Sequence, residues 1–417
     1  MAKIIAIIGA LDTKGQEFAF LKAEIEKRGC RTLAINVGVL GTPLFQPEVS
    51  AEEVAAAGGV NLADLVARHD RGHAMEVMNR GAAAVVKKLY GELKFDGIVS
   101  MGGGGGTGVA ASAMRALPVG TPKLLVSTVA AGDISPYVGT TDITIMPSIV
   151  DVAGLNRISR TIFTNAAGAI CGMVTGEVEK SPDDKPLIAA TMFGNTTRAV
   201  DNARKILEAH GYEVLVFHAT GTGGRTMEML IENRYFAGVL DLTTTEWADE
   251  ICGGALSAGS TRMEAAAKAG VPQVVIPACI DMCNFWAPET VPAKYKDRRF
   301  YRWNPNVTLM RTTVEENARM GEIFAGKLNE AKGPVAVLIP MGGFSELDFP
   351  DQPFWWPEAD QAFVDALKKN LRQDIPVEIS DRDVNHPEFS SRAAEKLLEF
   401  LNAKLKKQYG NCTQRDS

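Results

Sequence analysis

The amino-acid sequence predicts an α/β protein with two Rossmann-like, doubly wound domains and mostly parallel sheets. Short runs of Val, Ile and Leu alternate with amphipathic stretches along the whole chain. Strands of that continuous apolar character are buried on both faces, as in parallel sheets. Strands alternating with helices form βαβ units. A chain of 417 residues is also too long for one ordinary core, which favours two domains.

The expected elements follow in order along the chain. In the first half the predicted strands are residues 3–10, 32–38, 97–103, 123–130 and 143–148. In the second half they are residues 187–194, 213–220, 238–245, 273–280, 335–343 and 376–380. Helical patterns such as residues 17–29 and 74–93 lie between them. The charged, Pro-containing stretch 175–186 lacks periodicity, so we place the domains at 1–182 and 183–417.

The two halves open alike, with a strand, a polar turn, a helix ending at Gly29 or Gly211, and a second strand. An ancient duplication and two ordinary βαβ units explain this equally well. Residues 281–312 are expected to form a long irregular insertion. Its aromatic side chains predict a homodimer or larger homo-oligomer, because a monomer seldom exposes so much apolar surface. They are Phe285, Trp286, Phe300, Tyr301 and Trp303.

Composition narrows the function classes. The net charge of −6 and the pI of about 5.6 argue against nucleic acid or a membrane surface as a partner. No apolar run approaches the ~20 residues that span a bilayer. The apolar start predicts a strand and not a signal peptide. Six scattered cysteines are expected as buried thiols in a reducing compartment, so a cytoplasmic location is predicted.

Five consecutive glycines, residues 102–106, stand between a predicted strand and a helix expected to start near Thr107. Glycine lets backbone N–H groups approach an anion, and a helix N-terminus adds free donors. Thr107 would cap that helix or contact a phosphate. The stretch matches neither the P-loop pattern nor a first-strand dinucleotide fingerprint. A phosphate cradle and a close-packed turn therefore both remain open.

Other strand ends in the first half carry small polar residues. Asp12 or Thr13 would cap the next helix, and Lys14 could meet a phosphate as a point charge. Asp133 or Asp151 could hold Mg²⁺ through water. Each residue also has a plain structural interpretation, as a helix cap, an ion-pair partner or a solvated charge.

The second half repeats the strand–glycine–helix pattern at residues 221–224. Arg225 could clasp a carboxylate or phosphate with two parallel hydrogen bonds, and Arg262 stands at another helix start. Glu246 and Asp281 follow strands and could act as a base or as metal ligands. Helix caps and salt bridges explain these residues equally well.

Several longer motifs resemble the Tm-1-like ATP-binding family, also named uncharacterised protein family UPF0261. They include "DTKGQE", "MGGGGGTG", "DVAGLNRISR", "DLTTTEWADE" and "PMGGFSELD", and they cover nearly the whole chain in order. The resemblance implies two Rossmann-like domains, ATP binding by the family's plant virus-resistance member, and dimers. The chain departs from the family at Asn36, where an acid is usual, and at Asp383 and His386, whose types are exchanged.

These observations predict ATP, with Mg²⁺, in the amino-terminal domain, and no metal site is specified otherwise. The candidate cofactor-binding residues are Asp12, Thr13, Lys14, Asn36, Gly102, Gly103, Gly104, Gly105, Gly106, Thr107, Ser127, Thr128, Gly132, Asp133, Asp151 and Asn156. The candidate catalytic residues, expected to face the nucleotide across an interdomain gap, are Arg225, Glu246, Arg262 and Asp281. The leading hypothesis is an ATP-dependent enzyme acting on a small anionic metabolite. The alternative is a nucleotide-sensing module; a nicotinamide dehydrogenase fits less well.

Overall fold

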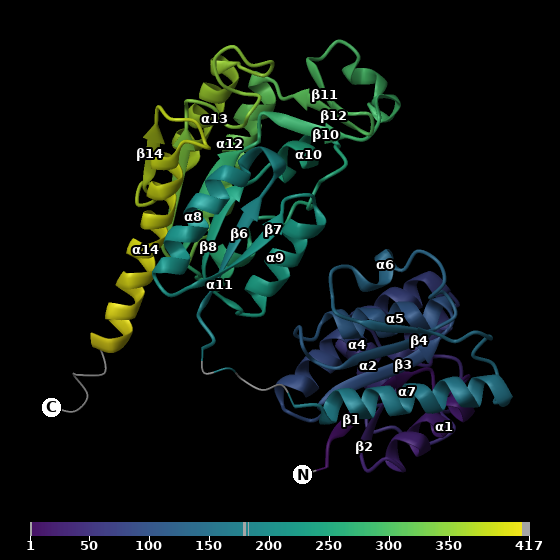
Figure 1. Cartoon of the computed structure of the whole chain (residues 1–417). Helices are drawn as coiled ribbons and strands as arrows, with labels where there is room; N and C mark the ends of the chain where they lie inside the picture. Colours follow the sequence, from purple (N-terminus) through teal and green to yellow (C-terminus); the bar gives the residue numbers. More distant parts are fainter. Residues whose placement is uncertain (1, 178–180, 182, 411–417) are drawn as a thin grey trace. The chain divides into compact units, whose positions relative to one another are not determined.

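The computed structural model describes residues 2–177, 181 and 183–410. It divides the chain into two compact units, Met1–Lys180 and Ser181–Ser417, here called unit 1 and unit 2 (Figure 1). The domain boundary predicted from the sequence lies between residues 182 and 183, and residue 182 is outside the described residues. Cys412 also lies outside them.

Unit 1 is built on a five-stranded parallel sheet in the order β2-β1-β3-β4-β5 (Figure 1). Its strands are β1 Ile4–Gly9, β2 Arg31–Asn36, β3 Gly97–Gly102, β4 Lys123–Ser127 and β5 Thr144–Pro147. Its helices are α1 Gly15–Glu26, α2 Ala51–Ala57, α3 Leu62–Ala67, α4 Arg71–Gly91, α5 Gly104–Arg115, α6 Ser135–Val138 and α7 Arg157–Thr175. Ile98 and Val99 point to opposite faces of the sheet, into cores formed with α2, α4 and α5 and with α1 and α7 respectively.

Unit 2 is built on a six-stranded parallel sheet in the order β14-β13-β9-β8-β6-β7. Its strands are β6 Leu187–Met192, β7 Glu213–His218, β8 Phe236–Thr243, β9 Gln273–Ala278, β13 Val335–Pro340 and β14 Val377–Ser380. Its helices are α8 Thr197–Ala209, α9 Thr222–Glu232, α10 Glu246–Cys252, α11 Ala265–Ala269, α12 Val314–Asn329, α13 Pro357–Asn370 and α14 Pro387–Gly410. Helices α8 and α14 cover one face, and α10, α12 and α13 pack on the other.

The insertion at 281–312 contains three strands, so the expectation of a wholly irregular segment was wrong, although turns and two short 3-10 helices lie between β10 and β11. It forms a three-stranded antiparallel sheet, β10-β12-β11, with β10 Met282–Phe285, β11 Phe300–Asn304 and β12 Val307–Arg311. The turn between β11 and β12 is short enough to join antiparallel neighbours directly. The expectation that Phe285 is exposed was also wrong, since it is buried against Tyr295, whereas Trp286 and Trp303 are exposed.

Both parallel sheets confirm the doubly wound fold. In each sheet the second strand lies on one side of the first and the third strand on the other. The chain changes direction across the sheet at that point, and in open α/β sheets ligands bind beyond the carboxyl ends of the strands there. The switch point lies between β1 and β3 in unit 1 and between β6 and β8 in unit 2. Among the described residues no helix is long and apolar enough to cross a membrane.

Candidate functional site

A cavity of about 810 Å³ lies at the switch point of unit 1. Its floor consists of the glycines that follow β3 and of residues 12–14, which follow β1. Its wall comes from the loop after β2 and from α3 and α4. The apolar side chains of that wall are Val37, Val39, Leu40, Leu65, Val66, Met75 and Met78. Two basic residues, Lys14 and Arg71, also line the cavity.

The glycines form the first turn of α5 and not a loop before it. The helix begins at Gly104, and its N-cap residue, Gly103, has no side chain to bond the first N–H groups. The N–H groups of the first helical turn have no partner within their helix. A Cβ on Gly104 would meet nothing within 4 Å, whereas a Cβ on Gly102 would lie 3.0 Å from Gly106 Cα. The stretch is therefore tight at Gly102 and open at Gly104.

Thr107 is not the cap that the sequence suggested. It lies inside α5, it is fully buried, and its Oγ1 lies 2.7 Å from Oγ of Ser127. The helix starts three residues earlier, at Gly104, although glycine loses more conformational freedom in a helix than other residues do. Glycine adds nothing to the apolar periodicity, so the pattern alone placed the helix start too late.

The loop after β1 also differs from the expectation. The N-cap of α1 is Lys14 and not Asp12 or Thr13. The Asp12 carboxylate instead accepts hydrogen bonds from the N–H groups of Leu40, at 2.8 Å, and Gly41, at 3.1 Å. Asp12 therefore holds the loop after β2 in place as one wall of the cavity.

Asn36 supports this wall without lining the cavity. Its Oδ1 accepts from the N–H groups of Leu11, at 3.0 Å, and Gly38, at 2.9 Å, and its side chain is buried. The amide thus ties the ends of β1 and β2 together. The position where a carboxylate would bind a ribose hydroxyl has become a structural tie.

The structure brings part of the predicted nucleotide site together. The residues that line the cavity are Asp12, Thr13, Lys14, Gly102, Gly103, Gly104, Gly105, Gly106 and Asp151. Those that do not line it are Asn36, Thr107, Ser127, Thr128, Gly132, Asp133 and Asn156. Asn156 caps α7. Hydrogen bonds from the hydroxyl and then the N–H of Ser135 to the Asp133 carboxylate lower the pKa of Asp133.

Sequence reasoning missed the α3–α4 side of the cavity. Arg71 and Met75 lie at the start of α4, and Arg71 Nη2 lies 3.7 Å from where a Cβ on Gly105 would be. The amphipathic pattern of α4 predicts a helix, but only the tertiary packing shows that its first turn faces the glycines. Among the described residues no group of His, Cys, Asp and Glu is arranged to hold a metal ion.

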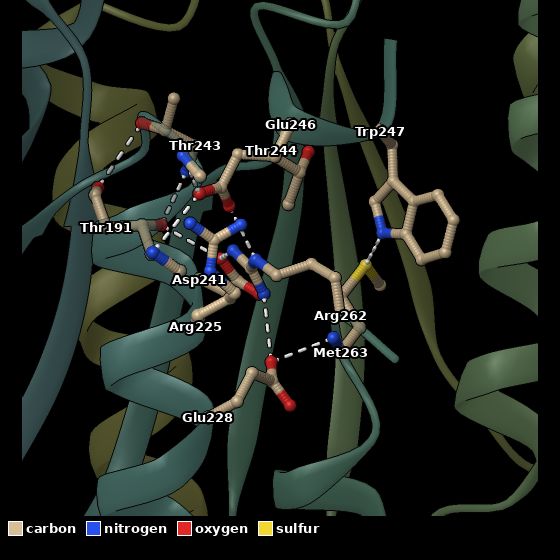
Figure 2. Close-up of polar contacts among 12 residues, drawn as sticks. Thr191, Arg225, Glu228, Asp241, Thr243, Thr244, Glu246, Trp247, Arg262 and Met263 are labelled. Atoms are coloured by element: carbon tan, nitrogen blue, oxygen red, sulfur yellow. Dashed lines mark hydrogen bonds and ion pairs between the residues drawn. The ribbon is translucent and has the colours of Figure 1, made fainter. Parts of the chain in front are cut away.

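The switch point of unit 2 is filled by side chains (Figure 2). Arg262 is 1% exposed, and its guanidinium donates to both carboxylate oxygens of Asp241, at 2.6 and 2.7 Å. Its Nε donates to Glu246 at 2.6 Å, and Nη1 lies 3.2 Å from Glu228. Burial opposes the charge of Arg262, yet Asp241 and Glu246 outweigh it and raise its pKa. This cluster of four residues is called the Arg262 cluster below.

Glu246 occupies the place expected for an anionic ligand. Its second oxygen accepts from the N–H groups of Gly221, at 2.8 Å, and Gly224, at 3.1 Å. A Cβ on Gly224 would lie only 2.4 Å from the carboxylate oxygens. The glycine-rich turn before α9 therefore does bind an anion, and the chain supplies that anion itself.

The side chains of the other two candidate catalytic residues take no part in these bonds. Arg225 is exposed and donates to the carbonyl oxygen of Ser257 at 3.0 Å. Asp281 is fully buried after β9, and it accepts from Ser345 at 2.8 Å. Burial and the neighbouring Asp348 raise the pKa of Asp281 well above its ordinary value. Asp281 makes no direct contact with the Arg262 cluster in the bonds described.

Two doubly wound α/β units, one with an open cavity at its switch point, define a two-domain Rossmann-like protein. More particularly, the chain belongs to the uncharacterised protein family UPF0261. The family's N-terminal domain matches residues 3–179 and its C-terminal domain matches residues 185–401.

Curated relatives align with most of this chain. A UPF0261 protein of Clostridium tetani is 50% identical over 402 residues, covering 96% of this chain and 100% of its own. The tomato ToMV resistance protein Tm-1(GCR237) is 34% identical over 415 residues, which are 94% of this chain and 55% of that protein. The tomato ToMV susceptible protein tm-1(GCR26) is 39% identical over 79% of this chain and 45% of its own length.

Solved structures resemble the chain only in outline. The UDP-N-acetylglucosamine 2-epimerase of Rickettsia bellii aligns with 97% of this chain and 98% of its own, at 10% identity and a TM-score of 0.24. MurG of Acinetobacter baumannii aligns with 96% and 100%, at 11% identity and a TM-score of 0.21. At such scores neither likeness bears on function.

Proposed function

We propose that unit 1 binds ATP, together with Mg²⁺, in the cavity at its switch point. One observation carries the proposal: an open cavity lies at that position, and its floor is the uncapped first turn of α5. Free N–H groups at a helix N-terminus favour phosphate. The apolar wall offers a surface on which a nucleobase can pack.

The charged residues of the cavity suit the same ligand. Lys14 and Arg71 can neutralise phosphate oxygens, Lys14 as a point charge and Arg71 through paired N–H groups. Asp151 lines the cavity and is exposed, so it is our candidate for holding Mg²⁺ through water.

We also propose that the protein is an ATP-dependent enzyme acting on a small anionic metabolite. Arg225 is our candidate in unit 2 for binding such an anion, because it is an exposed arginine in the first turns of α9. The second candidate function is a non-catalytic nucleotide sensor. It is favoured by the bonding of Glu246 and Arg262, which are committed to each other and to the surrounding backbone.

Ligand-dependent melting tests the ATP proposal. A ligand at 100 times its dissociation constant adds about 2.7 kcal/mol to the free energy of unfolding. We expect MgATP to raise the melting temperature of the full chain and NAD to leave it unchanged. A larger rise with NAD than with ATP contradicts the proposal. Release of ADP or phosphate in the presence of sugar acids or keto acids separates the enzyme from the sensor.

We further propose a cytoplasmic homodimer. The cysteines of the described residues are all unpaired and buried, which suits a reducing compartment. Trp286 is 53% and Trp303 is 44% exposed on the small antiparallel sheet, and such aromatic surface favours association. Light scattering should give twice the chain mass of 44.7 kDa, and a stable particle of 44.7 kDa argues against the dimer.

A further inference from the structure

The loop after β2 has few N–H groups left to recognise a base. The N–H of Val37 donates to the carbonyl of Gly9, and the N–H of Gly38 donates to Asn36. Those of Leu40 and Gly41 both donate to Asp12. In residues 37–41 of the described chain, these bonds leave only the backbone N–H of Val39 without an acceptor.

The side chains of the same wall are mostly apolar. Asp70 lines the cavity, but its Oδ1 already accepts a hydrogen bond from the N–H of His73. His69 also lines the cavity, but an imidazole can either donate or accept and so fits either purine. An apolar pocket discriminates weakly between similar groups, whereas a pocket built to hydrogen-bond one group rejects others strongly. Little on this wall distinguishes adenine from guanine.

The Asn36 side chain is not available as a ribose acceptor either. Asn36 stands where an acid would bind the sugar hydroxyls, and its Oδ1 already accepts two backbone N–H groups. A 2′-hydroxyl therefore gains no hydrogen bond from that oxygen.

The basic side chains near the expected phosphates differ from this wall, because their charges are not used in bonds within the described chain. Among the residues that the structure describes, the side chains of Lys14 and Arg71 make no hydrogen bond or ion pair. Arg71 Nη2 lies over the first turn of α5, as its 3.7 Å separation from a Cβ position on Gly105 shows. Lys14 begins α1 at the same cavity. Both cations thus line the cavity whose floor includes the free N–H groups of α5.

We infer that this cavity selects its ligand by the number of phosphates and not by the base or the 2′-hydroxyl. It takes nucleoside triphosphates as a class, and Arg71 is a phosphate-binding residue of the site. The inference rests on the proposed nucleotide site and sharpens it.

Calorimetric titration of the full chain with MgATP, MgADP, AMP, MgGTP and Mg-dATP tests the inference. We expect the dissociation constants of ATP, GTP and dATP to agree within about threefold, and AMP to bind at least tenfold more weakly than ATP. Arg71→Ala should weaken ATP binding about tenfold or more and leave AMP binding unchanged, and Arg71→Lys should recover part of the loss. Arg68→Ala, an exposed arginine outside the cavity lining, is the matched control and should change neither.

The outcomes separate the two proposals. If ATP binds but GTP or dATP binds more than tenfold more weakly, or AMP binds as tightly as ATP, the selectivity inference is overturned and the ATP site stands. If Arg71→Ala melts like the wild type and binds ATP equally well, the role of Arg71 is overturned. If none of the five nucleotides binds, both the site and the inference fail.

Discussion

Units 1 and 2 have the same strand order around their switch points, yet one switch point is hollow and the other is filled. In unit 1, β3 ends in glycines that border a cavity of about 810 Å³. In unit 2, β8 is followed by buried threonines and by Glu246 at the start of α10, which is 1% exposed. Topology therefore fixes where a ligand could bind, and the residues after the third strand decide whether there is room.

The bonds at the filled switch point of unit 2 indicate which ligand chemistry the hollow switch point of unit 1 could bind. In unit 2, two N–H groups of a glycine-rich turn bind the carboxylate of Glu246, and Arg262 neutralises it. In unit 1, the first turn of α5 has no side-chain cap, and two cations line its cavity. The same chemistry is satisfied internally in unit 2 and is available to a ligand in unit 1.

Removing the central cation of the Arg262 cluster should have the largest effect. Arg262→Met leaves the buried Asp241 and Glu246 without their partner, and a broken buried ion pair typically destabilises by about 3–5 kcal/mol. All five tryptophans, at 247, 286, 303, 355 and 356, lie in unit 2, so tryptophan fluorescence during denaturant unfolding reports on that unit.

The control for this variant is Arg225→Met, which alters an exposed arginine on the neighbouring helix α9. It should lower the free energy of unfolding by no more than about 1 kcal/mol. Equal losses in the two variants would mean that the buried charges of the Arg262 cluster contribute nothing special to unit 2.

Local patterns made much of this fold predictable. Apolar runs marked the strands of both parallel sheets, most clearly central strands such as β3, β4, β9 and β13, because a strand buried on both faces must be apolar throughout. The small antiparallel sheet was missed because β11 carries exposed polar and aromatic residues and resembles a loop. Helix starts at glycines were also misplaced, since glycine carries no periodic signal.

The sites were less predictable, because they depend on contacts between distant residues. Glu246 and Arg262 were both singled out from the sequence as functional. Nothing local shows that a side chain 16 positions away would bond Glu246 in a buried pair. Likewise, the apolar face of α4 predicts a helix, and only packing shows that Arg71 and Met75 lie over Gly105.

Adding bulk at matching glycines should separate binding from stability. Gly104→Val adds a side chain where nothing lies within 4 Å, so unit 1 should stay folded and MgATP binding should fall at least about tenfold, or 1.4 kcal/mol. Gly224→Val brings a Cβ within 2.4 Å of Glu246 and should instead destabilise unit 2 by about 1–3 kcal/mol.

Gly108→Val is the control for this pair. It lies in the same helix α5, it also has open space around it, and it does not line the cavity. It should leave ATP affinity within about twofold, apart from a helix-propensity effect on stability of a few tenths of a kcal/mol. Wild-type affinity in a folded Gly104→Val protein would show that the glycines are only a turn.

The stability of unit 2 should depend on pH through two buried carboxyls. Burial raises the pKa of Asp249 from 3.8 to about 7, and it raises that of Asp360 likewise to about 7. The folded state of unit 2 therefore holds protons that the unfolded state has released between about pH 4 and 7.

The sign follows from this proton difference: the stability of unit 2 falls as the pH rises through that window. From pH 5.5 to 8.5 we expect a loss on the order of 2 kcal/mol for each such carboxyl, measured by tryptophan fluorescence. Asp249→Asn should flatten the slope, and Asp201→Asn, an exposed control on α8, should not. A stability that rises over the same range would contradict the raised pKa values.

The smallest expected effect concerns Thr107, which the sequence suggested as a phosphate contact. The hydroxyl is buried and is bonded to Ser127, so it stabilises the junction of α5 and β4 and does not face the cavity. Thr107→Val keeps the shape and removes one hydroxyl, which should lower the free energy of unfolding by about 1 kcal/mol. Ser127 retains the N–H of Val129 as a donor, so its oxygen is not left without a partner.

Because the backbone of the glycine turn is unchanged, the ATP affinity of Thr107→Val should stay within about twofold of the wild type. Far-UV circular dichroism, which follows the helices of both units, combined with ATP titration would measure the two quantities on one sample. A tenfold loss of affinity with unchanged stability would show that Thr107 contacts the ligand after all, and the first turn of α5 would then have to open when phosphate binds.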